Sequence, residues 1–417
     1  MGLIDRIVSR SLQKDVSPGE IAIVKVDVVY AQDGTAPLII DVIENELGMG
    51  KLAAADRSYL FIDHLAPAPH IAAASAHKRM RRFAEKYGVR LFDAGYGISH
   101  QVVVEDGIVR PGMVAVGADS HTPTVGAIGA YATGIGSTDA AIAMVYGELW
   151  LRIPETVKIV LSGPIPKGVY GKDIILYMVG EFKTDGMIGK SVEFHGNALK
   201  NLTIDSRMTI TNMCTEMSAE SAIIPVDEVV LRWLDEHGYS IARKVDGEDL
   251  GEYVDVIPVE VSRLEPMVAA PPDVDNVATV GEVEGMEVDQ VFIGSCTNGR
   301  LEDIEVAARI IKNKKISKRV RCIVSPASRR VYRDALKMGY VDVLIEAGCI
   351  VAPPTCGPCV GAHMGLLAEG EVAIATTNRN FMGRMGHRES RVYLASPATA
   401  AASAIEGRIA DPRKYLS

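Results

Sequence analysis

Short apolar runs alternate with helical patterns along almost the whole of this 417-residue sequence. The apolar runs have the length of buried strands, and the segments between them repeat apolar residues at helical spacing. This alternation is typical of α/β domains with mainly parallel sheets. The expected strands are 21–30, 157–161, 289–294, 320–325, 349–352 and 372–376, and the expected helices are 72–86, 138–151, 226–237, 303–314 and 327–338.

Length and local composition divide the chain. A chain of 417 residues is too long for one ordinary domain. Residues 262–288 are rich in proline and acidic residues and have no periodicity, so we expect a linker there, and a second break is expected near 135–155. The predicted domains are residues 1–135, 136–265 and 266–417, each of α/β type.

Charge and cysteine content exclude several classes of protein. The net charge of −9 argues against a nucleic acid or an anionic membrane as the main partner. The first twenty residues contain no apolar run of signal-peptide length, and no apolar span long enough to cross a membrane occurs elsewhere. We therefore expect a cytoplasmic protein with reduced thiols. In such a protein, clustered members of its six cysteines indicate metal or redox chemistry.

Polar motifs follow five apolar runs of the sequence. In a parallel sheet the carboxyl ends of the strands face the ligand crevice, so loops in this position can converge on one site. The motifs, each after the run it follows, are His64 after 59–62, Asp119-Ser120-His121 after 113–116, Cys296 after 289–294, Cys356 after 349–352, and Asn378-Arg379 after 372–376.

Three cysteines form the most specific pattern. Cys356 and Cys359 are a C-x-x-C pair, and Cys296 lies 60 residues upstream. Three thiolates with a fourth position open suit a [4Fe-4S] cluster that exposes one iron. Two alternatives stay open. A structural zinc site needs a fourth ligand, for which Cys349 and His363 are nearest, and C-G-P-C is also the redox tetrapeptide of thioredoxins, although here it comes late in the chain.

Two histidines have a carboxylate close by in the sequence, in Asp63-His64 and Asp119-Ser120-His121. A carboxylate beside an imidazole fixes its tautomer and raises its pKa, which suits a general acid toward a hydroxyl leaving group. One such pair alone is usually a structural hydrogen bond. Two of them on strand-end loops, together with His100, favour a catalytic site.

Two arginines follow the strand expected at 372–376. Arg379 and Arg384 lie in the run TTNRNFMGR. The guanidinium fork matches a carboxylate in bidentate fashion, so we expect these side chains to bind an acidic substrate. The alternative is a solvated basic turn.

Taken together, the motifs resemble the aconitase superfamily, and the resemblance covers nearly the whole chain. The length is similar to that of one branch, the large subunits of 3-isopropylmalate dehydratase and archaeal homoaconitase. Single-chain aconitases carry a further swivelling domain with a serine in a G-S-S-R-E motif, which this sequence lacks. The motifs are GSCTNGR (294–300), PTCGPCVG (354–361), GADSHTPTVGAIGAYATGIGSTD (117–139), YAQDGT (30–35), FIDHL (61–65) and TTNRNFMGR (376–384).

The resemblance implies three α/β/α domains around one shared [4Fe-4S] cluster, which hydrates or dehydrates a small hydroxy-di- or tricarboxylic acid. It also implies a small partner subunit that carries the swivelling domain and the serine base. The implied cluster ligands are Cys296, Cys356 and Cys359; the implied catalytic residues are Asp63, His64, His100, Asp119, His121 and Glu193, the last near the open iron; the implied substrate-binding residues are Gln32, Ser120, Asn378, Arg379 and Arg384.

One segment leaves the substrate open. Residues 212–224 read NMCTEMSAESAII, where relatives more often have a glycine-containing E-x-G-A. The candidate activities are therefore 3-isopropylmalate dehydratase, homoaconitase, and hydration of citraconate (to 2-methylmalate) or of the dimethylmalate type. A cluster-free RNA-binding regulator is the alternative from another class, and the net charge of −9 argues against it.

Overall fold

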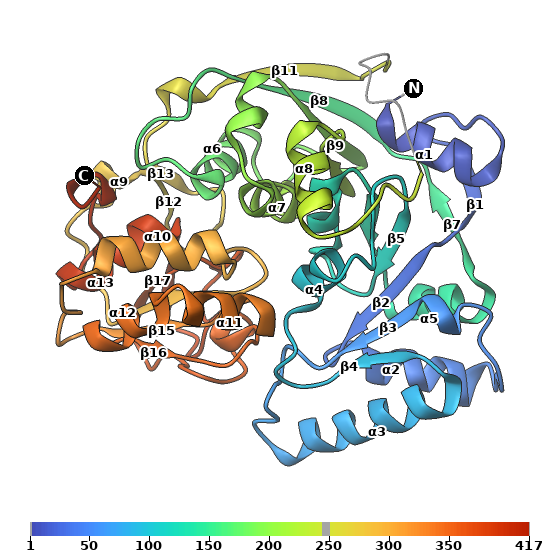
Figure 1. Ribbon diagram of the computed structural model, residues 1–417, viewed down its shortest axis with the longest axis horizontal. Coiled ribbons are helices and arrows are strands. Elements are labelled where there is room, and N and C mark those ends of the chain that lie inside the picture. The colour runs from blue at the N-terminus through green and yellow to red at the C-terminus, as the bar shows by residue number, and fades with distance from the viewer. Residues whose placement is uncertain (1, 244–250, 417) are drawn as a thin grey trace.

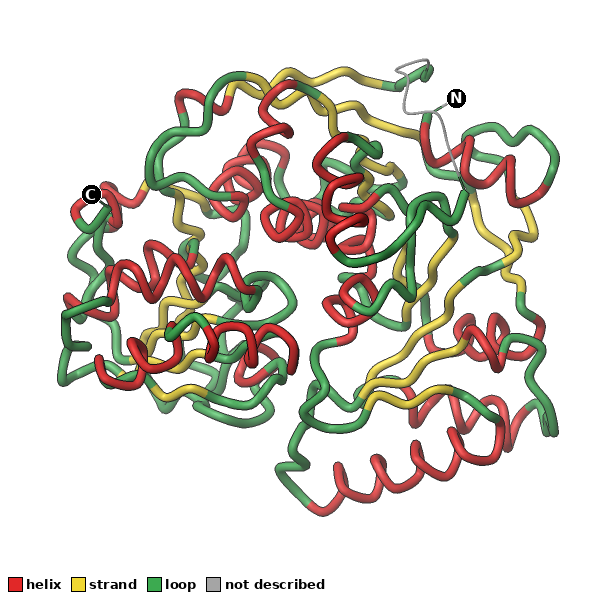
Figure 2. The backbone as a smooth tube through the Cα atoms, viewed as in Figure 1, coloured by secondary structure: helices red, strands yellow, loops and turns green. Residues whose placement is uncertain are grey.

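The computed structural model of the protein describes residues 2–243 and 251–416. Met1, where the first predicted domain begins, and Ser417, where the last one ends, lie outside the described residues. In the described part, three sheets and a two-stranded ribbon alternate with helices (Figures 1 and 2). The predicted α/β class with mainly parallel sheets is confirmed. None of the described helices is both long and apolar enough to span a membrane.

The first sheet is parallel and has the strand order β4-β3-β2-β5-β6. Both of its faces are covered, because successive side chains of β2 alternate between two apolar cores. Val29 and Ala31 face the core of helices α1, α2, α3 and α5, whereas Val28 and Tyr30 face the core shared with α4, α7 and α8. The strands are β2 Val28–Gln32, β3 Ser58–Phe61, β4 Arg90–Phe92, β5 Val114–Gly117 and β6 Tyr131–Gly134. The helices are α1 Leu3–Leu12, α2 Ala36–Asp41, α3 Ile71–Tyr87, α4 Ser99–Glu105 and α5 Ser137–Tyr146.

The second sheet is also parallel, with the order β10-β9-β8-β11. Helices α6 and α7 pack on it and share one apolar core with residues of the third sheet, such as Phe292. The second and third sheets therefore pack against the same apolar core. The strands are β8 Glu155–Ser162, β9 Lys190–His195, β10 Ser221–Ile223 and β11 Asp255–Glu260, and the helices are α6 Gly171–Phe182, α7 Ile204–Met213 and α8 Glu228–Glu236.

The third sheet has the order β13-β12-β18-β17-β14-β15-β16, with β12 antiparallel to its neighbours and β14 to β18 parallel. Helices α10 to α13 cover one of its faces. The strands are β12 Met267–Ala269, β13 Val277–Thr279, β14 Gln290–Ile293, β15 Arg321–Val324, β16 Ile350–Val351, β17 Val372–Ala375 and β18 Arg391–Ala395. The helices are α9 Val280–Val283, α10 Leu301–Ile311, α11 Arg329–Lys337, α12 Tyr340–Ala347 and α13 Pro397–Glu406.

The structure corrects three sequence expectations. The run 21–30 is two strands, β1 Ile21–Lys25 and β2, because Val26 N–H bonds to the Gly147 carbonyl and Asp27 N–H to the Val114 carbonyl, so the chain changes partners there. The expected helix 138–151 ends at Tyr146, since Gly147 takes a left-handed φ of 77°, and its remainder is β7 Glu148–Arg152, antiparallel to β1. The expected linker 262–288 contributes β12 and β13 to the third sheet. The domain boundaries stay a prediction.

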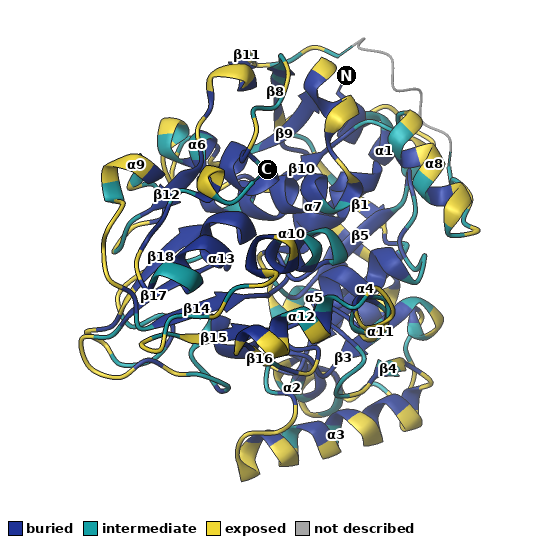
Figure 3. Cartoon of the chain, turned by 60° about the vertical axis from the view of Figure 1, so that its left-hand side comes forward, coloured by how far each residue is buried: buried dark blue, intermediate teal, exposed yellow. Residues whose placement is uncertain are grey.

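Burial follows the layers (Figure 3), with buried strands inside and an exposed outer face along α3. Cys214, Cys322 and Cys349 are buried away from the C-x-x-C loop, and the latter two sulfurs lie 3.1 Å apart on adjoining strands. Gly126 has room only for hydrogen, because an added Cβ would lie 1.7 Å from the Ala222 carbonyl oxygen. This close approach lets the turn 122–128 pack directly on β10.

Phe292, on β14, supports the loops that carry the three predicted ligand cysteines. Its side chain is fully buried. The ring edge would meet a Cβ added to Gly294 at 2.7 Å and one added to Gly357 at 3.1 Å, so it fills the space beneath both loops.

Phe292→Ala should lower the free energy of unfolding by about 3–5 kcal/mol, because it removes a fully buried ring. Denaturant titration measures the change as a shift in midpoint of the transition that includes the third sheet. Leu336→Ala, on the exposed side of α11, is the matched control and should change stability by less than about 0.5 kcal/mol. Equal effects of the two variants would contradict the packing described.

Candidate active site

Cys296, Cys356 and Cys359 lie on two neighbouring loops at the carboxyl end of the third sheet. Cys296 follows β14, and the other two follow β16, in and beside a single 3-10 turn. The three thiols are 7, 3 and 4 % exposed, and none forms a disulfide. Asn378, after β17, joins the two loops: its Nδ2 is 3.5 Å from Cys296 Sγ and its Oδ1 is 3.9 Å from Cys359 Sγ. The predicted convergence of these three strand ends is found in the structure.

The thiols are poised for a cation. Burial raises the pKa of the Cys296 thiol to about 11, and burial also raises the pKa of Cys356. Positive charge close to these sulfurs would therefore favour their thiolate form. Asn212 Nδ2 donates to Cys296 Sγ at 3.3 Å, which stabilises the sulfur once it is anionic.

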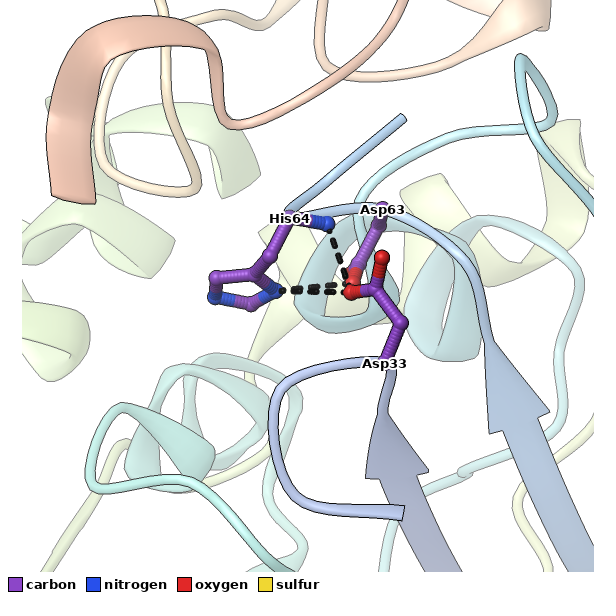
Figure 4. Close-up of side chains that lie close together, drawn as sticks. All are labelled: Asp33, Asp63 and His64. Carbon is purple, nitrogen blue, oxygen red and sulfur yellow. Dashed lines mark hydrogen bonds and ion pairs between the residues drawn. The ribbon is translucent and has the colours of Figure 1, made fainter. Parts of the chain in front are cut away.

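His64 is held by two carboxylates (Figure 4). Its Nδ1 lies 2.8 Å from Asp63 Oδ1 and 3.9 Å from Asp33 Oδ1, and the close-up shows both carboxylates on that side of the ring. Burial acts to lower the pKa of His64, but the charges of Cys356 and Asp63 outweigh it, so this pKa is raised well above its usual value. The neighbouring Asp63 carboxylate, and Cys356 when it is a thiolate, therefore favour the protonated form of this ring.

These carboxylates have a geometry that could ligate a metal, but their oxygens are already used. Asp33 accepts hydrogen bonds from the backbone N–H groups of His64 and Leu65 and contacts the His77 ring at 2.9 Å. Asp63 Oδ2 accepts from the Ser99 N–H at 2.7 Å. The group therefore orients His64.

A second network surrounds Asp119. His100 Nε2 lies 2.9 Å from Asp119 Oδ1, its Nδ1 lies 2.9 Å from the Tyr30 hydroxyl, and the His121 N–H donates to the same carboxylate oxygen. Burial acts to raise the pKa of Asp119, but hydrogen bonds from His100 and His121 outweigh it and hold this pKa well below the usual range. Asp119 is thus a fixed anion between two imidazoles.

Glu216 links this network to an arginine. Its Oε1 lies 2.8 Å from His121 Nε2, and Arg379 Nε lies 3.0 Å from the same oxygen. Arg379 Nη2 also donates to Ser120 Oγ at 3.1 Å. Burial acts to lower the pKa of His121, but hydrogen bonds to Asp119 and Glu216 raise it overall.

Sequence reasoning missed Asn212 and Glu216. Both lie at the end of α7, which follows no strand directly, so the strand-end argument does not reach them. The one sequence feature that could have indicated these two residues is the segment 212–224, whose sequence departs from that of relatives.

Gln32 lies in the site, whereas Glu193 and Arg384 have other surroundings. Gln32 Nε2 donates to Ser99 Oγ, and its buried Oε1 has no partner among the described residues. Arg384 stacks over Phe381 at 5.3 Å and keeps a buried Nε without a described partner. Its contact with a substrate stays a prediction.

The structure does not bring Glu193 into either network. Val192 and Phe194 face the shared core, so Glu193 points to the opposite face of β9. There it accepts from the Leu3 N–H at 2.8 Å and lies 2.8 Å from His195 Nε2. The expected position of Glu193 near an open iron is therefore not supported, and the carboxylate between His121 and Arg379 is Glu216.

The rival metal and redox interpretations fit less well. Cys349 Sγ packs against Cys322 in an apolar core, and His363 Nε2 is 2.8 Å from the His64 carbonyl oxygen, so neither of these atoms completes a closed zinc site. The CGPC sequence lies in a 3-10 turn of four residues and does not open a long helix. With neither Cys349 nor His363 placed as a fourth ligand in the part of the chain that the structure describes, the three buried thiols suit a cluster with one exposed iron.

Comparison with known proteins gives a consistent result over the whole chain. The family model "Aconitase family (aconitate hydratase)" matches residues 5–407. Large subunit 1 of 3-isopropylmalate dehydratase from Methanopyrus kandleri is 48% identical and large subunit 2 from Archaeoglobus fulgidus is 49% identical, each over 99% of both chains. The structure of holo aconitase X from Thermococcus kodakaraensis aligns with a TM-score of 0.51 and 12% identity over 85% of this chain and 84% of that one, which supports the fold alone.

Glu216→Gln should lower the pKa of His121, because it removes one of the two carboxylates that favour the protonated ring. An NMR titration of the imidazole signals measures the change. Glu220→Gln, in the same segment but without a His121 contact in the described structure, is the control and should leave this titration unchanged. A His121 pKa that does not respond to Glu216→Gln would contradict the geometry.

Proposed function

We propose that this chain, which belongs to the aconitase family, is the large subunit of a [4Fe-4S] 3-isopropylmalate dehydratase in the cytoplasm. The reaction isomerises 2-isopropylmalate to 3-isopropylmalate by dehydration and rehydration, a step of leucine biosynthesis. The observation that carries the proposal is the contact of Asn378 with two of three buried thiols, beside histidines, carboxylates and arginine suited to a hydroxy acid. Relatives named as 3-isopropylmalate dehydratase large subunits, which match 99% of this chain, support the proposal.

Cys296, Cys356 and Cys359 would hold the cluster. When bound, its iron without a cysteine ligand would supply Lewis-acid chemistry toward the substrate hydroxyl. The residues around the cysteines fit such an anionic group, because Asn212 and Asn378 present N–H donors to Cys296 Sγ.

Protonated imidazoles of the chain would serve the departing hydroxyl. The raised pKa values of His64 and His121 favour the protonated ring, which is the form that can donate a proton. Asp63 lies against the His64 ring, and Asp119 accepts from the His121 N–H, so these carboxylates position the two histidines. His100, held between Tyr30 and Asp119, orients Asp119 in turn.

Arginine side chains would bind the substrate carboxylates. Arg379 pairs with Glu216 through Nε and with Ser120 through Nη2, which fixes the plane of the fork while its side chain stays 32% exposed. Gln32 Oε1 and Arg384 Nε have no partner among the described residues, so each can still bond to a ligand.

The base that removes the carbon-bound proton would come from a partner. The relatives are named as large subunits, which implies a separate small subunit. We propose that it carries the swivelling domain and a serine base. No serine in the networks described here is free of competing bonds, since Ser99 N–H and Oγ and Ser120 Oγ are engaged with Asp63, Gln32 and Arg379.

Anaerobic reconstitution should load about four irons and four sulfides per chain. Cys296→Ala, Cys356→Ala and Cys359→Ala should each lose most of the bound iron and the visible absorption, because each removes a ligand. Cys349→Ala, outside the site, should load like the unaltered protein. One zinc per chain, or no metal, in the unaltered protein would contradict the proposal.

Activity should require both subunits. The loaded chain alone should be at least about 100-fold less active than with the small subunit, since it lacks the base. The coupled formation of 3-isopropylmalate measures this, with homocitrate-type, citraconate and dimethylmalate substrates assayed in parallel. If kcat/KM is higher on one of these other acids than on 2-isopropylmalate, the function is the activity on that acid. For the homocitrate-type substrate this would be homoaconitase.

A further inference from the structure

Two fully buried cations lie behind the loops of the candidate active site. Lys172, near the start of α6, and Arg300, just before α10, are each 0% exposed. They come from elements far apart in the sequence, and only Arg300 belongs to one of the motifs quoted above, GSCTNGR. A lysine at the amino end of a helix interacts unfavourably with the helix dipole, so the dipole does not explain why Lys172 lies at the start of α6.

Each cation bonds to two successive backbone carbonyls of one loop. Lys172 Nζ donates to the carbonyl oxygens of Thr376 and Thr377 at 3.0 and 2.5 Å, directly before Asn378. Arg300 Nη2 and Nη1 donate to the carbonyl oxygens of Cys296 and Thr297, both at 2.6 Å. The two loops are also joined, because the Gly294 N–H donates to Thr376 Oγ1.

Neither cation has a carboxylate within ion-pair distance in the part of the chain that the structure describes. Asp173, next to Lys172, instead accepts from the N–H groups of Tyr170 and Met267. Asp303, near Arg300, accepts from the Arg300 N–H and from Asn298. Burial raises the pKa of Asp303 and lowers the pKa of Lys172, both to about 7, so the charged form of Lys172 depends on the anions near it.

A fully buried cation without a counter-charge is costly, so a compensating anion is expected close by. The acidic groups whose charge acts on these two side chains are the cysteine sulfurs and the nearby carboxylates, among them Asp173 and Asp303 for Lys172 and Asp205 and Asp303 for Arg300. The negative charges of Cys359 and Cys296 are among those that act on Lys172, and Arg300 acts in turn on Cys296.

We propose that Lys172 and Arg300 are the built-in counter-cations of the cluster, and that they balance the three cysteine thiolates while positioning the loops of Cys296 and Asn378. This inference rests on the proposed function, because it takes the three thiolates to be cluster ligands. Both are positioning residues, since each acts through backbone carbonyls and charge and touches no substrate.

A purely structural role makes a different prediction from a charge role. If the side chains only tie the loops in place, a neutral donor of similar length preserves the site. If their charge matters, a neutral donor makes the site more negative and reduction of the cluster harder, whereas a cationic replacement does not.

The test is the midpoint potential of the reconstituted cluster, measured by anaerobic redox titration. Lys172→Gln keeps an N–H donor but removes the positive charge. At the other position, Arg300→Gln also removes the charge, whereas Arg300→Lys keeps it. Arg309→Gln, exposed on α10, and Lys200→Gln, exposed before α7, are matched controls. Circular dichroism establishes that each variant is folded.

Lys172→Gln and Arg300→Gln should each reduce the equilibrium constant for reduction at least about tenfold, which is a potential about 59 mV more negative for one electron. Arg300→Lys and both controls should stay close to the unaltered protein. Should Lys172→Gln not fold, the two Arg300 variants still decide.

Folded neutral variants with unchanged potential would overturn the charge assignment, as would an equal shift in Arg300→Lys. These outcomes are distinct from a failure of the proposed function, in which the unaltered protein itself would take up no cluster.

Discussion

Three hydrogen bonds between distant loops hold the candidate site together. The Cys356 N–H and Thr355 Oγ1 both donate to the Asp63 carbonyl oxygen, at 3.0 and 2.8 Å, and the His363 ring bonds to the carbonyl of His64. They join the end of β3, in the first sheet, to the cysteine loop of the third sheet. Because Asp63 and His64 belong to that strand end, the same contacts bring the first histidine to the thiols. They therefore connect two halves of the site that belong to separate sheets.

Electrostatics explains why so many polar groups can be buried there. His64 and His100 each lie against a carboxylate, and Arg379 lies against Glu216, so these buried polar groups have hydrogen-bonding partners. The cysteines are the exception. Burial favours their neutral thiol form, and two cations stand behind their loops. A group that carries positive charge onto the sulfurs, such as the proposed cluster, would complete this arrangement.

Much of this could be predicted from the sequence. Parallel strands direct their carboxyl ends to one edge of the sheet, so polar residues that directly follow apolar runs can be predicted to lie in the site. His64, Asp119, Cys296 and Asn378 are such residues. Glu216 and Asn212 do not, because their position depends on how α7 packs on the turn 122–128, where Thr211 and Asn212 bond to Thr124.

Other features depended on tertiary contacts in the same way. Lys172 reads as an ordinary surface lysine until the fold encloses it. Glu193 follows a good motif, but strand alternation turns its side chain toward α1. The strands β12 and β13 are short and lie in a proline-rich segment, so only their pairing with the third sheet defines them.

The central claim is that three cysteines leave one iron of a cluster open to a hydroxy acid. Mössbauer spectroscopy of the protein, loaded anaerobically with ⁵⁷Fe, tests it most directly. Adding 2-isopropylmalate should change the signal of about one iron in four and leave the other three unchanged. A spectrum in which all irons respond alike, or none does, would contradict the claim.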